Sequence, residues 1–98
     1  MEQWLRCTIT PGMFPGEVGV EALQFDGSPI SLFAPEDSAD WEEPLNKDRA
    51  VAGWLRVRVV ERKGDHVLVR LPRECFLSGY YVTVKSEQLE TRPQKQRV

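Results

Sequence analysis

The alternation of apolar and polar residues with a period of two is the feature that most constrains the fold of this chain. It is clearest from Trp54 to Pro72, in the stretch "WLRVRVVERKGDHVLVRLP". Successive side chains of a β-strand point to opposite faces, so this alternation predicts strands with one buried face. The dipeptide Lys63–Gly64 interrupts the pattern as a turn does, and the stretch is therefore predicted to be one β-hairpin.

The register of this hairpin is predicted from the pairing that buries a purely apolar face. A two-residue loop at Lys63–Gly64 mixes valines and arginines on both faces. A three-residue loop over residues 62–64, with Gly64 in the left-handed conformation, avoids this mixing. It gives the apolar pairs Leu55–Leu71, Val57–Val69 and Val59–Val67. A slip by one residue moves valines into water, so we predict the three-residue loop.

The same register gathers the arginines of the hairpin on its other face. It places Arg56 opposite Arg70, with Arg58 on the same face. Like charges directly opposite each other are destabilising unless an acidic group lies between them. We expect Glu17 and Glu21, from a neighbouring strand, to neutralise these arginines. A negatively charged partner is the alternative.

Further strands are predicted by the same period over residues 4–10, 17–25, 30–34 and 80–85. In the last of these, Tyr80, Val82 and Val84 are expected to point inward, and Tyr81, Thr83 and Lys85 outward. A short 3₁₀ turn is expected over residues 86–89, anchored by Leu89. No segment has the periodicity of an amphipathic helix. The prediction is an all-β barrel of about five to six antiparallel strands, forming a single domain over residues 1–90.

The run "RVRVVERKGDHVLVRLP", followed by a loop, "YYVTV" and "SEQL", resembles the later hairpins of an SH3-like barrel, over residues about 50–90. The resemblance is architectural. The chain has no ALYDF-type opening, no adjacent Trp-Trp pair and no P-x-N-Y ending, which mark peptide-binding SH3 domains. No peptide-binding residue is therefore carried over from that family. An OB-like barrel is the nearest competing fold.

Two loops and a tail are predicted outside the strands. Residues 35–48, "PEDSADWEEPLNKD", hold two prolines and six acids and are expected to form a long acidic loop, with Trp41 docked onto the body. The segment "PGMFPG" is a second loop, in which Phe14 either plugs one end of the barrel or forms an exposed apolar tip. Residues 91–98 are polar and basic, and we expect a flexible, disordered tail.

The sequence gives no constellation of residues typical of an enzyme. His66 is the only histidine, and Cys7 and Cys75 lie far apart, so a zinc site is excluded and no metal or cofactor is expected. The two cysteines are expected to be buried, reduced thiols, with a disulfide as the alternative. We expect a cytoplasmic protein, because the chain shows neither a secretory leader nor a run of about 18 apolar residues.

Binding is the function class that remains. The first expectation is a non-enzymatic protein-interaction or regulatory module, present as a monomer or weak homo-oligomer. Its candidate partner-binding residues are Arg56, Arg58, Arg70, Tyr81, Phe14 and Trp41. The alternative is a nucleic-acid-binding barrel that uses the Arg56, Arg58 and Arg70 face. Against it, the net charge is −2 and the ten acids of residues 1–48 would repel phosphate.

Overall fold

The fold is built almost entirely from β-strands. The structure is a computed structural model that describes residues 2–76 and 79–92. The strands are β1 (Glu2–Pro11), β2 (Glu17–Leu23), β3 (Pro29–Pro35), β4 (Ala39–Trp41), β5 (Val51–Lys63), β6 (His66–Cys75), β7 (Gly79–Lys85) and β8 (Leu89–Glu90). Two 3₁₀ turns, η1 (Glu36–Ser38) and η2 (Ser86–Gln88), complete the list of elements. No helix in the part of the chain described is long and apolar enough to span a membrane.

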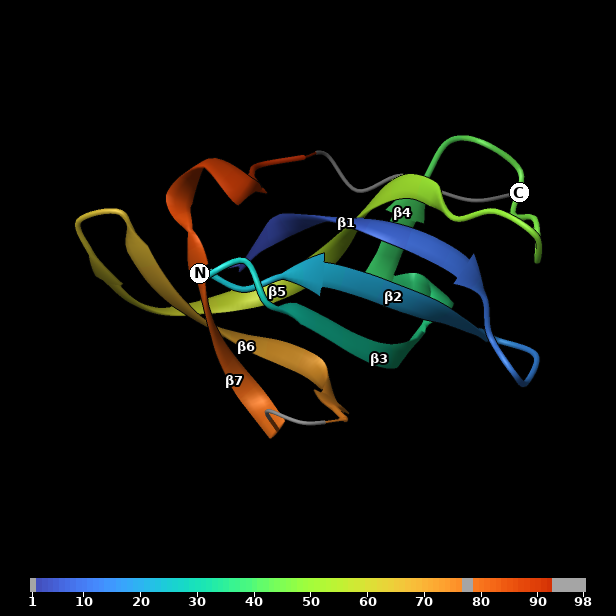
Figure 1. Ribbon diagram of the computed structural model, residues 1–98, viewed down its shortest axis with the longest axis horizontal. Coiled ribbons are helices and arrows are strands. Elements are labelled where there is room, and N and C mark those ends of the chain that lie inside the picture. Colours follow the sequence, from blue (N-terminus) through green and yellow to red (C-terminus); the bar gives the residue numbers. More distant parts are fainter. Residues whose placement is uncertain (1, 77–78, 93–98) are drawn as a thin grey trace.

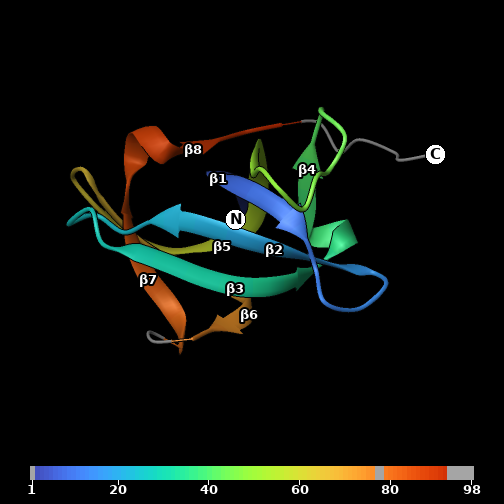
Figure 2. The same cartoon turned by 45° about the vertical axis from the view of Figure 1, so that its right-hand side comes forward.

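The strands form one antiparallel sheet that is strongly curled into an open half-barrel (Figure 1). Six strands follow the order β3-β2-β1-β5-β6-β7, while β4 adds to β5 and β8 adds to β1. The curl brings β3 across to β6 (Figure 2). The all-β prediction is confirmed, but the end strands β3 and β7 do not pair with each other, so no closed barrel is formed.

The core consists of the side chains that the alternation of apolar and polar residues predicts to point inward. The largest fully buried ones are Leu5, Ile9, Leu32, Leu55, Leu71, Val18, Val57, Val67, Val69 and Val84. Cys7 and Cys75 are both buried and free, as predicted. The faces of the central hairpin are therefore as the sequence indicated.

The pairing within that hairpin differs from the prediction. Lys63 pairs with His66, so the loop has two residues, with Gly64 at a φ of 60° as its first. A bulge between Val59 and Glu61 then shifts the register, and Val59 faces Val69. The predicted pairing is wrong by three residues between the loop and the bulge, and by two residues beyond the bulge, at Arg58 and Val59. A shift of two residues keeps every side chain on its face, so burial alone could not exclude it.

The acidic segment is more ordered than the predicted loop. It contains η1 and β4, and Trp41 of β4 pairs with Gly53 and packs against the core, which confirms its predicted docking. Met13 and Phe14 are 72% and 67% exposed, so Phe14 forms a tip rather than a plug. Leu89 packs against the core, as predicted. Of the predicted tail, residues 93–98 lie outside the described residues.

Candidate functional site

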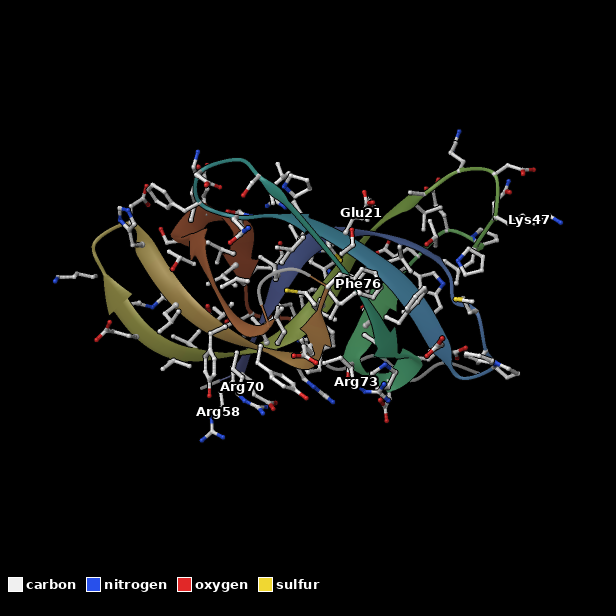
Figure 3. All side chains as sticks on the ribbon, turned by 60° about the horizontal axis from the view of Figure 1, so that its bottom comes forward. Glu21, Lys47, Arg58, Arg70, Arg73 and Phe76 are labelled. Atoms are coloured by element: carbon white, nitrogen blue, oxygen red, sulfur yellow. The ribbon has the colours of Figure 1, made fainter. Side chains whose placement is uncertain are left out.

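A row of basic and aromatic side chains crosses the outer face of β5, β6 and β7. Arg58 of β5 lies opposite Arg70 of β6, which in turn lies opposite Tyr81 of β7. Neighbouring strands are about 4.8 Å apart, so these side chains follow one another directly. Figure 3 shows Arg58 and Arg70 on the same side of the molecule, with Arg73 of β6 further along that side.

Tyr80 supports this row from β7. The guanidinium carbon of Arg70 lies 4.7 Å from the centre of the Tyr80 ring, a cation–π contact that holds the arginine toward β7. Tyr80 and Tyr81 are 38% and 54% exposed. The prediction of an inward Tyr80 is wrong. The β6–β7 register is irregular between Arg70 and Cys75, so the start of β7 leaves the regular inside-outside alternation. We call Arg58, Arg70, Arg73, Tyr80 and Tyr81 the arginine–tyrosine surface.

The expected neutralisation by Glu17 and Glu21 is not found. In residues 2–76 and 79–92, no carboxylate lies within 4.0 Å of Arg58, Arg70 or Arg73; every ion pair there involves Arg6 or Arg92. Glu21 instead accepts a long hydrogen bond from the hydroxyl of Ser31. Both glutamates belong to β2, and β1 separates β2 from β5.

Half of the candidate residues lie outside this row. Arg56 is opposite Trp4 of β1, with its guanidinium carbon 5.9 Å from a Trp4 ring centre. Trp41 is part of the core boundary, and Phe14 is at the β1–β2 tip. The sequence missed Arg73 and Tyr80. Arg73 follows Pro72, the predicted end of the hairpin, whereas β6 continues to Cys75.

A second charged cluster, the Arg92 clamp, has an architectural role. The guanidinium of Arg92 donates to Asp40 at 3.1 Å and Glu90 at 3.4 Å, and it lies 3.5 Å from a ring centre of Trp54. Burial alone lowers the pKa of Arg92, but the hydrogen bonds to Asp40 and Glu90 raise it overall. The guanidinium stays charged and ties the end of β8 to β4 and β5.

The histidine and the cysteine that could carry chemistry, His66 and Cys7, are both engaged in packing. His66 stacks on Phe25, with the ring centres 3.7 Å apart. Burial raises the pKa of Cys7 to about 12, so its thiol stays protonated at neutral pH. No group of three or more His, Cys, Asp or Glu side chains within the described residues is arranged to hold a metal ion.

Comparisons with protein-family models, with curated proteins and with solved structures find no match to this chain. The arginine–tyrosine surface therefore has to be interpreted from its own chemistry.

Proposed function

We propose that this chain is a non-enzymatic binding module whose arginine–tyrosine surface binds an acidic segment of a protein partner. The observation that carries the proposal is the pair Arg58 and Arg70. The two lie directly opposite each other, and no carboxylate of the described residues lies within 4.0 Å of either. Like charges in this position cost free energy, which a bound carboxylate offsets because guanidinium groups bind it through paired hydrogen bonds.

The tyrosines favour a protein partner. Tyr and Arg are enriched at protein interfaces, where they supply much of the binding free energy. Both tyrosines of the surface are exposed and lie next to Arg70. A ring that is already in contact with an arginine loses little conformational freedom when a partner covers it.

The acidic neighbours of the surface favour a short acidic segment over a nucleic acid. Glu2 of β1 lies opposite Arg58, and Glu74 follows Arg73 in β6. Glu2 thus bounds the row at its β1 end, and Glu74 adds a second carboxylate in β6. A long phosphate backbone would extend past these carboxylates and be repelled by them. A short segment with a few acids can bind while contacting only the row of Arg58, Arg70 and Tyr81.

We further propose that residues about 50–90 are analogous in architecture to an SH3-like barrel. This analogy indicates no particular partner, because such folds host many functions. Buried, free cysteines are compatible with a reducing, cytoplasmic setting. The proposed activity requires no cofactor.

The proposal is tested by fluorescence anisotropy with a labelled decaglutamate peptide at an ionic strength of about 0.1 M, where charges more than about 10 Å apart are largely screened. Arg58→Glu/Arg70→Glu should weaken binding at least tenfold, a loss of about 1.4 kcal/mol. The matched control is Lys47→Glu/Arg49→Glu, which makes the same change in net charge at two exposed positions between β4 and β5. Figure 3 shows Lys47 far from Arg58 and Arg70. It should change the affinity less than about twofold, within the small effect of a distant screened charge.

Two outcomes would contradict the proposal. Equal weakening by both double variants would mean that the peptide responds only to net charge. Absence of binding to the wild-type protein would remove the surface as an acid-binding site. A single-stranded RNA that binds more tightly than the peptide, with a steep salt dependence, would replace the protein partner by a nucleic acid.

A further inference from the structure

One side of β7 has almost no backbone partner. β7 is an end strand of the sheet and pairs through one edge with β6. On the other edge, in the part of the chain that the structure describes, the C=O of Thr83 accepts a hydrogen bond from the N–H of Phe25 at 2.8 Å. No other backbone hydrogen bond there involves this edge. Figure 1 shows β7 at the margin of the sheet, with β6 along one side.

The position of Thr83 identifies which backbone groups face this free edge. In an antiparallel strand, the N–H and C=O of one residue point to the same side, and the next residue points to the other. The C=O of Thr83 faces the free edge, so its N–H does too, as do the N–H and C=O of Tyr81. None of these three groups has a backbone partner among the described residues. An added strand could bond all three.

The free edge of β7 is covered at Thr83 by the bond from Phe25, but the strand lacks the prolines and the central charges that usually block strand addition. Proteins protect end strands with prolines, with charges or by covering them. β3, the other end strand, begins at Pro29 and ends at Pro35. β7 contains no proline, and its one charged residue is Lys85 at its end. The sheet therefore protects one end strand and leaves the Tyr81 end of the other accessible next to the arginine row.

We propose that the acidic segment binds as an additional β-strand along Tyr81–Thr83 of β7, with its acidic side chains on the face of Arg70. This inference rests on the proposed function and specifies its mode of binding. Arg70 already leans over Tyr80, a β7 residue, and thus toward the added strand. Alternate residues of a strand share a face, so the partner carries acids at every second position.

Backbone methylation of a peptide tests strand addition without changing charge. The probe is a ten-residue peptide of alternating glutamate and valine. One derivative is N-methylated at every glutamate and the other at every valine, and each loses the N–H donors of one edge only. Strand addition predicts that one derivative loses at least tenfold in affinity while the other binds within about twofold of the parent. Which derivative fails reports whether the added strand is parallel or antiparallel.

Hydrogen exchange tests the same contact from the side of the protein. The amides of Tyr81 and Thr83 should exchange at least tenfold more slowly when the unmethylated peptide is bound, because both N–H groups become hydrogen-bonded. The amide of Val82, which faces β6, serves as the internal reference and should change less.

The outcomes separate the two proposals. If the unmethylated peptide binds through Arg58 and Arg70, but both methylated forms behave alike and the exchange of Tyr81 is unchanged, strand addition is overturned and the proposed function stands. If the unmethylated peptide does not bind, both are overturned.

Discussion

Removing the guanidinium of the Arg92 clamp should destabilise the fold far more than removing a surface charge. The side chain of Arg92 is 14% exposed and that of Asp40 only 5%, so their 3.1 Å ion pair is largely desolvated. Breaking such a pair from one side costs several kcal/mol, because the remaining charge is buried with less compensation. The change that tests this is Arg92→Ala.

The magnitude follows from the separate contacts. The charge-assisted hydrogen bond to Asp40 contributes about 1.5–3 kcal/mol. The stack on Trp54 adds about 1 kcal/mol, and the more exposed Glu42 and Glu90 add a few tenths each. We expect a loss of about 3 kcal/mol in the free energy of unfolding. For a domain of this size, that lowers Tm by about 12–24 °C.

The assay is thermal and urea unfolding followed by circular dichroism. Arg92→Lys keeps the charge but loses the planar stack, so about half of the loss is expected. Arg58→Ala removes an exposed arginine that forms no ion pair with the described residues, and should change stability by less than about 0.5 kcal/mol. The Arg92→Ala deficit should persist at about 1 M salt, since buried pairs are weakly screened. A Tm for Arg92→Ala within a few degrees of the wild type would refute this account of the clamp.

Three further predictions concern the core. Gly53→Ala places a Cβ against Ile9 and 2.7 Å from the carbonyl oxygen of Asp40, and should cost about 1–3 kcal/mol by urea unfolding; an unchanged midpoint would contradict this packing. Val57 is 2% exposed, so Val57→Asp buries an unpaired charge and should show no cooperative melt; wild-type melting would contradict its inward face. The pKa of Cys7 rises from 9.0 to about 12 on folding, so the unfolded chain loses this proton first. Stability should therefore fall between pH 9 and 12 relative to Cys7→Ala, and parallel pH profiles would exclude the effect.

The sequence predicted which face of each strand is buried, because that information is present in the alternation itself. It could not predict the register of the central hairpin. The two-residue turn at Gly64 and the bulge beside Val60 together preserve the faces, and only the partners change. Arg58 rather than Arg56 therefore lies opposite Arg70.

The order of the strands in the sheet is the second property that the sequence could not predict. Pairing Glu21 with Arg70 requires their strands to be neighbours, but β1 and β5 both intervene between β2 and β6. The Arg92 clamp depends on strand order in the same way. β8 pairs with β1, and β4 pairs with β5, which brings Arg92 to Asp40, 52 residues earlier in the chain. No local pattern encodes such a contact.

The central claim is that acidic segments bind where Arg58, Arg70 and Tyr81 form one row. NMR titration of the labelled protein with decaglutamate tests it most directly, because every amide reports its own environment. The account predicts the largest shifts at these three residues and little change at Lys47, at the far end of the molecule (Figure 3). Shifts concentrated away from the row, or equal shifts over the whole surface, would contradict it.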